Sequence, residues 1–295
     1  MNIRHLLFGI LATWLAAGSI PQATAGETAT PRGILYEVRS PTGVAPSFLF
    51  GTIHSEDKRV LDLPVPVRSA FEASSNVALE VVPDASAIIK AMVTMAYTDG
   101  RRLRDVLPED LYRETATALG TLGMTEDAFK DLKPWAVVTL LGSPPSETGE
   151  FLDMLIYRRA AEDGKRIAGL ETMAEQLAVF DELSETDQIA LLRETLASRE
   201  RLPLIFDALI AAYLERDVGG LQTLSERYLA ESEPALAAIF QEVVIDARNL
   251  RMAERMASLL AEGGWFIAIG ALHLPGDQGI VELLRRRGHD VTIVF

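Results

Sequence analysis

Residues 265–276 read WFIAIGALHLPG, an apolar run that leads into a glycine, a histidine and a second glycine. The five apolar residues from Trp265 to Ile269 predict a buried strand. Gly270 then allows the chain to turn sharply where that strand ends. His273 follows at the carboxyl end of the strand, before a helix predicted around residues 278–284, which is where open α/β sheets form ligand crevices. The stretch therefore predicts an α/β fold with a site at this edge of its sheet.

The same G-x-x-H pattern occurs near the other end of the chain, in FLFGTIH at residues 48–54. This second apolar run and the strand-like residues 34–38 flank a turn at residues 40–43, which predicts a hairpin. Strand ends that are distant in sequence can meet at one sheet edge. A single G-x-x-H favours a core histidine with a satisfied hydrogen bond. Because the pattern is repeated, we expect His54 and His273 to share a crevice.

Two glutamates belong to strand-like runs between these histidines. Glu80 lies in NVALEVVP, residues 76–83, where its apolar neighbours oppose solvation, and a buried carboxylate needs a cation, a donor network or a proton. It is either a metal ligand or general base, or a solvent-facing residue of an edge strand. Glu171 ends a strand predicted at 165–171, directly before a capping box. It either favours the positive end of the next helix or points into the histidine crevice.

The composition excludes several classes of protein. The chain has 295 residues, a formal net charge of −14 and no cysteine. Without cysteine there are no disulfides, no thiol catalysis and no thiolate metal sites. Its acidity makes the chain a poor candidate for binding nucleic acid or an anionic membrane surface.

The first 25 residues have the pattern of a signal peptide. Arg4 precedes an apolar run from Leu6 to Ala17 that is too short to span a bilayer comfortably, and Ala23-Thr24-Ala25 supplies the cleavage pattern. We expect cleavage after Ala25 and export to the periplasm or the exterior. No later run is long and apolar enough for a second membrane segment.

Residues 26–295 are expected to form a single domain with a largely helical middle at about 84–262. The strand predicted at 165–171 interrupts this middle, and the last helix is expected roughly from Ala237 to Leu260. In that helix Arg248 and Asn249 are either ordinary surface groups or donors aimed at a substrate. A turn containing His289, expected to be exposed, leads into a closing strand.

At these residues the chain resembles the TraB/PrgY/GumN family, in its GumN-like branch, and through it the Tiki-type metalloproteases. The matching segments occur in the family's order: LFGTIH (49–54), VALE (77–80), GLET (169–172), ARNLRM (247–252) and IGALHLPGDQGIVELLRRRGHDV (269–291). The resemblance implies an α/β fold like those of ChaN and the erythromycin esterases, in which the two ends of the chain build a central mixed sheet around a large helical insertion. It also implies a divalent-metal site: His54, Glu80 and His273 match its key positions, and Glu171, Arg248 and Asn249 match secondary motifs.

With no thiolate ligand, a manganese, cobalt or zinc ion held by imidazoles and carboxylates is expected. A water activated there would attack a peptide amide, with Glu80 or Glu171 as the remaining carboxylate base. Arg248 or Asn249 would stabilise the oxyanion. The alternative is an exported binding protein that sequesters a peptide, haem or a metal ion without turnover. A serine hydrolase is a weaker choice, because the chain has no G-x-S-x-G motif.

Overall fold

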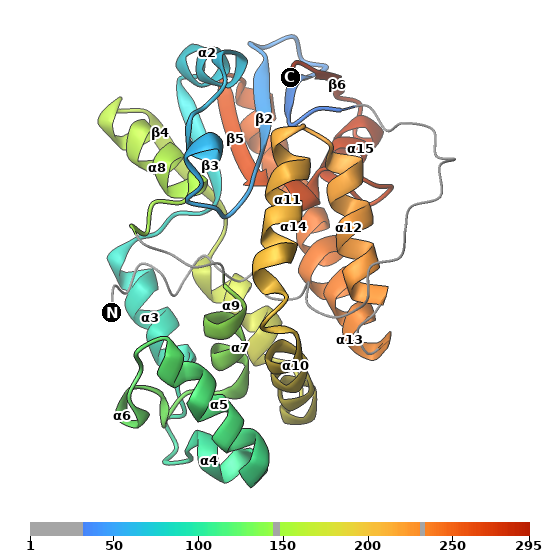
Figure 1. The fold of residues 1–295 in the computed structure, drawn as a ribbon. Helices are drawn as coiled ribbons and strands as arrows, with labels where there is room; N and C mark the ends of the chain where they lie inside the picture. The colour runs from blue at the N-terminus through green and yellow to red at the C-terminus, as the bar shows by residue number, and fades with distance from the viewer. Residues whose placement is uncertain (1–31, 144–147, 231–233) are drawn as a thin grey trace.

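The computed structural model describes residues 32–143, 148–230 and 234–295 (Figure 1). A sheet with strand order β4-β3-β5-β2-β1-β6 lies at one end of the molecule, and most of the shorter helices gather at the other end. The predicted signal peptide, residues 1–25, lies outside the described residues. The strands are β1 (Leu35–Arg39), β2 (Ser47–Thr52), β3 (Asn76–Val81), β4 (Arg166–Glu171), β5 (Trp265–Gly270) and β6 (Asp290–Ile293).

The sheet is mixed and is built from both ends of the chain. The predicted hairpin is confirmed, since β1 and β2 pair antiparallel, and β6 adds to the other edge of β1. β2, β5, β3 and β4 run parallel, with β5 between β2 and β3. The run from Trp265 to Ile269 is fully buried within β5, as its continuous apolar pattern predicts. The α/β fold predicted from the sequence is therefore confirmed.

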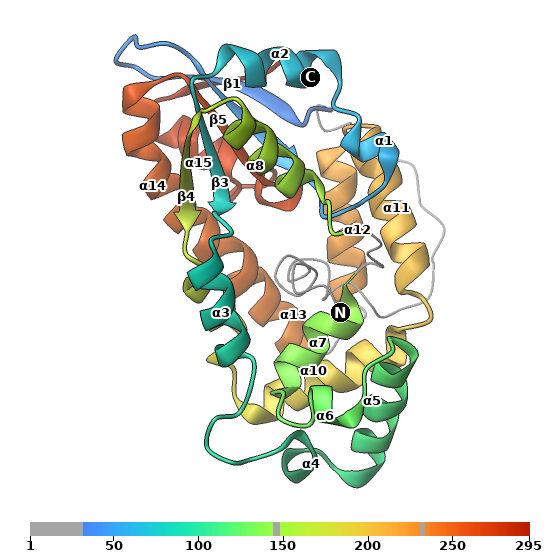
Figure 2. The ribbon, with the colours of Figure 1, turned by 90° about the vertical axis from the view of Figure 1, so that its left-hand side faces the viewer.

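Helices cover both faces of this sheet. α8 packs against β3, β4 and β5 on one face, and α14 and α15 lie on the other (Figure 1, Figure 2). The helices are α1 (Lys58–Leu61), α2 (Val65–Ala73), α3 (Ala85–Thr94), α4 (Leu103–Val106), α5 (Glu109–Thr121), α6 (Glu126–Phe129), α7 (Pro134–Gly142), α8 (Leu152–Glu162), α9 (Met173–Asp181), α10 (Glu185–Ser198), α11 (Leu202–Leu214), α12 (Val218–Ala230), α13 (Pro234–Ile239), α14 (Ala247–Glu262) and α15 (Ile280–Arg286). A π-helical segment, η3 (Phe240–Asp246), joins α13 to α14, and a 3₁₀ turn, η4 (Ala271–His273), follows β5.

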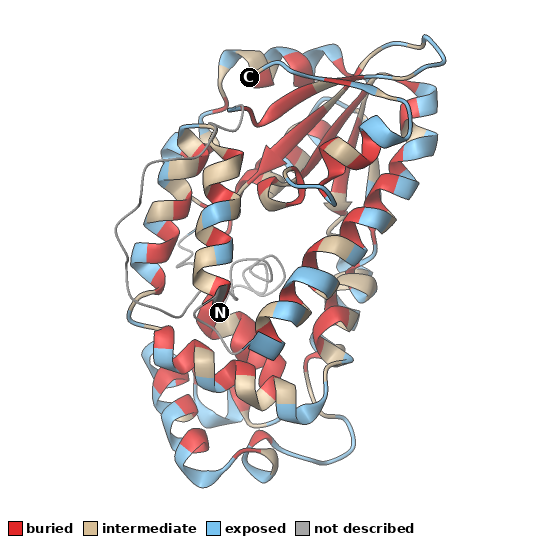
Figure 3. Ribbon diagram, turned by 90° about the vertical axis from the view of Figure 1, so that its right-hand side faces the viewer, coloured by how far each residue is buried: buried red, intermediate tan, exposed pale blue. Residues whose placement is uncertain are grey.

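The apolar side chains form two clusters. One surrounds the sheet, where Phe50 and Phe71 both contact the Phe266 ring at centroid distances of 5.6 and 5.5 Å. The other lies among the helices at the far end and includes Trp135 and Phe180. Figure 3 shows buried residues along the strands and on the inner sides of these helices. Each amphipathic helix thus has an apolar core to pack against.

Local signals in the sequence explain several helix starts. Asp84 caps α3 by accepting from the Ala87 N–H, and Thr172 with Glu175 forms the predicted capping box of α9. The helix predicted from Ala237 to Leu260 is present, but it contains the π-helical turn η3. One prediction was wrong: His289 is half-buried rather than exposed, because it follows the last turn of α15, and its Nδ1 is buried.

Candidate functional site

The sequence-predicted site residues follow four neighbouring parallel strands. β2 and β5 pair with Thr52 opposite Gly270, so His54 and His273 both lie just past the carboxyl ends of adjacent strands. β3 lies on the other side of β5 and carries Glu80. β4 pairs with β3, with Glu171 opposite Val81. Parallel strands end at one edge of the sheet, which brings this set of polar side chains to the same side of the fold.

Glu80 is held by donors on both of its carboxylate oxygens. Oε1 accepts the Gly270 N–H at 2.6 Å, and Oε2 accepts from Arg248 at 2.6 Å and from Gln176 at 3.0 Å. Burial raises the pKa of Glu80, but the Arg248 charge and the Gly270 N–H outweigh burial and lower this pKa to about 2. Only 14% of the side chain is exposed. Glu80 is therefore an ionised, nearly buried carboxylate with a fixed orientation.

Glu171 belongs to the same ion cluster and is more deeply buried. Its side chain has no exposed surface, and Oε2 accepts from Arg248 Nε at 2.9 Å and from Nη2 at 2.7 Å. Arg251 donates to its other oxygen at 3.0 Å, and Gln176 lies 3.3 Å from Oε2. Arg248, itself 2% exposed, bridges the two glutamates. A buried pair of carboxylates is thus balanced by two arginines of α14.

His273 has a defined tautomer because of Asn249. The Asn249 amide N–H donates to the Gln278 carbonyl at 2.8 Å, so its Oδ1 faces the His273 ring, 2.6 Å from Nδ1. Nδ1 consequently carries the proton and donates it to Asn249. Burial and the Arg248 charge lower the pKa of His273 to about 3, so the ring is neutral near pH 7. The buried Nε2 therefore presents a lone pair, and it has no hydrogen-bond partner among the described residues.

His54 lies beside an aspartate that the sequence reasoning did not single out. Its Nδ1 is 3.2 Å from Asp153 Oδ2, and the Thr52 hydroxyl donates to Asp153 Oδ1 at 2.7 Å. The Phe151 ring stacks against the imidazole at a centroid distance of 5.5 Å. Asp153 lies in the first turn of α8, where an acid is also expected simply to favour the helix dipole. Its position in the sequence therefore gave no specific signal of a role beside His54.

The donor chemistry around His273 and Glu80 fits a divalent cation. His273 Nε2 and Glu80 Oε1 lie 3.8 Å apart, which is too long for a hydrogen bond. Two ligand atoms of one tetrahedral ion, each about 2.1 Å from it, lie about 3.4 Å apart. A neutral imidazole and an ionised carboxylate are also the ligands that manganese, cobalt and zinc accept. Within the described ranges, however, no three His, Asp or Glu side chains converge closely enough to hold a metal ion.

The TraB/PrgY/gumN family model matches residues 34–293. This range includes strands β1 to β6 and the candidate site residues His54, Glu80, Glu171, Arg248, Asn249 and His273. The chain belongs to the TraB/PrgY/gumN family. Metalloprotease TIKI2 of Danio rerio is 26% identical to this TraB/PrgY/gumN member over 310 residues, which cover 87% of this chain and 60% of that protein. Metalloprotease TIKI1 of Homo sapiens is 26% identical over 299 residues, which cover 83% of this chain and 59% of that protein.

The chain thus spans about three fifths of the length of the curated relatives it matches. No solved structure matches it, so the likeness to ChaN and erythromycin-esterase folds stays a prediction. No helix in the described part of this TraB/PrgY/gumN chain has the length and apolarity needed to cross a membrane.

Proposed function

We propose that the chain is a metal-dependent hydrolase that cleaves amide bonds in peptides, with His54, Glu80 and His273 as its metal ligands. The observation that carries the proposal is the pair formed by His273 Nε2 and Glu80 Oε1. The buried Nε2 lone pair lies 3.8 Å from the ionised carboxylate and no described residue donates to it, an arrangement that is unfavourable until a cation or water joins it. The name metalloprotease carried by the relatives supports the same reaction class.

A bound manganese, cobalt or zinc ion would supply Lewis acidity and lower the pKa of a coordinated water. The protein's own contribution is to fix the ligands. Asn249 keeps the His273 proton on Nδ1, so that Nε2 stays free to bind. The Gly270 N–H and Arg248 keep Glu80 ionised and aimed at His273. Asp153 Oδ2 lies 3.2 Å from His54 Nδ1 as a charged neighbour, and Thr52 donates to the other oxygen of the aspartate.

We assign positioning roles to Glu171, Arg248 and Asn249, in place of the direct catalytic contacts expected from the sequence. All three are buried, and their polar groups are engaged with protein partners. Arg248 neutralises the two carboxylates, and Glu171 fixes the orientation of the guanidinium. Arg248 donates to Glu80 and Asn249 contacts the His273 ring, so these residues act on the reaction through Glu80 and His273.

The predicted signal peptide completes the proposal by assigning the enzyme to the periplasm or the exterior, where peptides or proteins would be its substrates. An exported protein without cysteine does not depend on the redox state of its compartment for stability.

The test is hydrolysis of a peptide library by metal-depleted protein, with manganese, cobalt or zinc restored one at a time. We expect at least one metal to restore cleavage, and His273→Ala and Glu80→Gln to lower kcat/KM by about a thousandfold or more. His289→Ala is the matched control, because that histidine lies at the far side of the sheet, beside β6, and its variant should retain full activity. If every metal-loaded sample is inactive although it binds peptide, the alternative of a sequestering protein replaces this proposal.

A further inference from the structure

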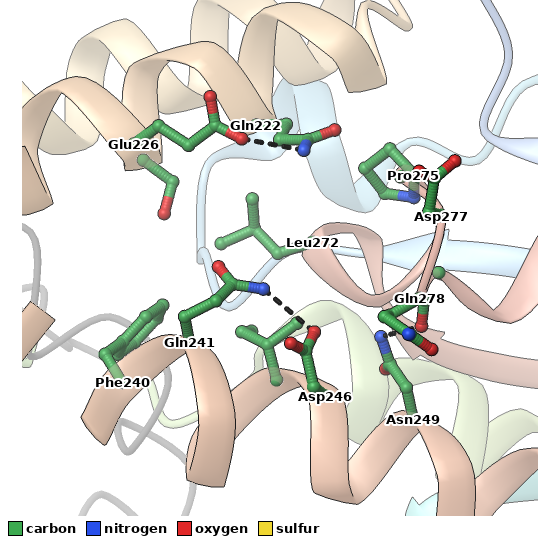
Figure 4. Close-up of a pocket in the computed structure, with 14 residues that line it drawn as sticks. Gln222, Glu226, Phe240, Gln241, Asp246, Asn249, Leu272, Pro275, Asp277 and Gln278 are labelled. Atoms are coloured by element: carbon green, nitrogen blue, oxygen red, sulfur yellow. Dashed lines mark hydrogen bonds between the residues drawn. The ribbon is translucent and has the colours of Figure 1, made fainter. Parts of the chain in front are cut away.

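A cavity of about 180 Å³ is lined in part by Asn249 (Figure 4). Its walls come from α12, from η3 with the start of α14, and from the loop after η4. Asn249 both lines this cavity and holds His273, so a ligand bound there would lie next to the candidate site. The cavity is several times larger than the roughly 30 Å³ occupied by one water, so it has room for a side chain.

The lining is acidic and rich in hydrogen-bond acceptors. Glu226, Asp246 and Asp277 contribute carboxylates, and none of the described residues that line the cavity is Lys, Arg or His. The nearby amides direct donors at these acids: Gln222 donates to Glu226 at 2.7 Å, and Gln241 donates to Asp246 at 2.8 Å (Figure 4). In each pair the amide donates to one oxygen of the carboxylate, Oε1 of Glu226 and Oδ1 of Asp246. The lining therefore favours a ligand that is positively charged and rich in N–H donors.

The Ser225 hydroxyl is a further polar group of the lining. Ser225 lines the cavity and is only 5% exposed, and no side-chain hydrogen bond joins its hydroxyl to a described residue. The hydroxyl is not one of the fully buried polar atoms, so it is open to the cavity. It can therefore bond to a polar ligand there, in addition to the carboxylates.

Apolar side chains complete the lining and indicate the shape of the ligand. Phe240, Ile245 and Leu272 provide a surface for methylene groups, while the acids lie around it. Lysine and arginine side chains combine an apolar stem with a charged, donor-rich end. A bare divalent cation fits less well, because within the described ranges no three acids converge in metal-binding geometry.

We propose that this cavity binds a lysine or arginine side chain of a peptide, and that it is a specificity subsite for the proposed hydrolase. The subsite role rests on the proposed function, whereas binding of the basic side chain does not. The shared Asn249 links the two sites, since it contacts the His273 ring on one side and the cavity on the other.

Isothermal titration of metal-depleted protein with Nα-acetyl-lysine amide and Nα-acetyl-arginine amide tests the proposal. Nα-acetyl-norleucine amide, which has a similar stem and no charge, is the comparison ligand. We expect a basic ligand to bind at least tenfold more tightly than the norleucine compound. Glu226→Gln combined with Asp246→Asn should weaken that binding by about tenfold or more. Glu254→Gln removes a charge from the exposed surface of α14, outside the cavity, and should leave binding unchanged.

Equal binding of the basic and neutral ligands, no binding of either, or unchanged binding in the double variant would overturn the proposal. Its failure is distinguishable from failure of the proposed function, because titration requires no hydrolysis. Cleavage without preference for basic residues, with KM unaltered in the double variant, would leave a hydrolase and reject the subsite. Tight binding of a basic ligand by a protein that never cleaves peptides would support binding of a basic side chain in the cavity and reject the proposed hydrolase.

Discussion

His273 Nδ1 lies 2.6 Å from Asn249 Oδ1, and this contact leaves the ring lone pair on Nε2, the nitrogen proposed as a metal ligand. Asn249→Ala removes the acceptor, so the ring can rotate or move its proton to Nε2. We expect metal affinity to fall by about 10–100-fold, as it does when other ligand-orienting groups are removed. Calorimetric metal titration measures the change. Gln278→Ala is the control, because Asn249 bonds to the main-chain oxygen of that residue; equal losses in both variants would contradict the assignment.

Arg248 is the cation on which two buried carboxylates depend. Arg248→Met leaves Glu80 and Glu171 with too few partners, and we expect the free energy of unfolding to fall by about 3–5 kcal/mol. Urea denaturation measures the loss. The double variant with Arg248→Met and Glu171→Gln has one fewer unpaired carboxylate. It should recover part of the lost free energy of unfolding. A stability for Arg248→Met within about 1 kcal/mol of the wild type would show that the cluster is not coupled as its geometry indicates.

Glu175, in the first turn of α9, makes the free energy of unfolding depend on pH. The Arg255 guanidinium and the Thr172 N–H lower the pKa of Glu175 from 4.5 to about 2. A carboxylate whose pKa is lower in the folded state stabilises the fold above pH 4.5, and this contribution is lost as pH falls towards 2. Because the side chain is 31% exposed, we expect Glu175→Gln to cost about 1–2 kcal/mol at pH 7. Denaturation at several pH values should show the difference between the two proteins shrinking below pH 4.5; a difference that stays constant would contradict this account.

Gly51, the glycine of the first G-x-x-H pattern, is required by close packing between β2 and η4. A Cβ at this position would lie 2.6 Å from Leu274 Cδ1 and 3.2 Å from the Ala271 Cα. Because Leu274 is fully buried, we expect Gly51→Ala to lower stability by about 1–3 kcal/mol, measured by thermal or urea denaturation. Gly120→Ala in α5 has open space around it and should be neutral or stabilising by up to about 1 kcal/mol. Similar losses in both variants would argue against a packing role for Gly51.

The strands of the site region were predictable because their signals are local and redundant. A continuous apolar run with glycine at its end predicts β5, and the same pattern predicts β2. Once both were assigned as strands, their carboxyl ends could be expected at one edge of the sheet, and the parallel pairing of β2 with β5 puts them there. The apolar neighbours of Glu80 favoured burial but left a solvent-facing position on an edge strand open; β3 lies inside the sheet, and the Glu80 side chain is 14% exposed.

The helical partners of the site were not predictable from the same signals. Gln176, Arg251 and Asp153 are polar residues of helices. From the sequence alone, each fits a solvent-exposed helix face as well as it fits the site. Which face turns inward depends on how α8, α9 and α14 dock on the sheet, which is a tertiary property. His289 shows the same limit, since a turn residue was expected to be exposed and is half-buried.

Cobalt(II) titration of the metal-depleted wild type and of His273→Ala, followed by absorption and calorimetry, tests the central claim most directly. The account predicts binding of one equivalent by the wild type, with spectra of nitrogen and oxygen ligation, and a loss of at least a hundredfold in affinity on removing His273. Identical titrations of the two proteins, or no binding by the wild type, would contradict a metal site built on His273 and Glu80.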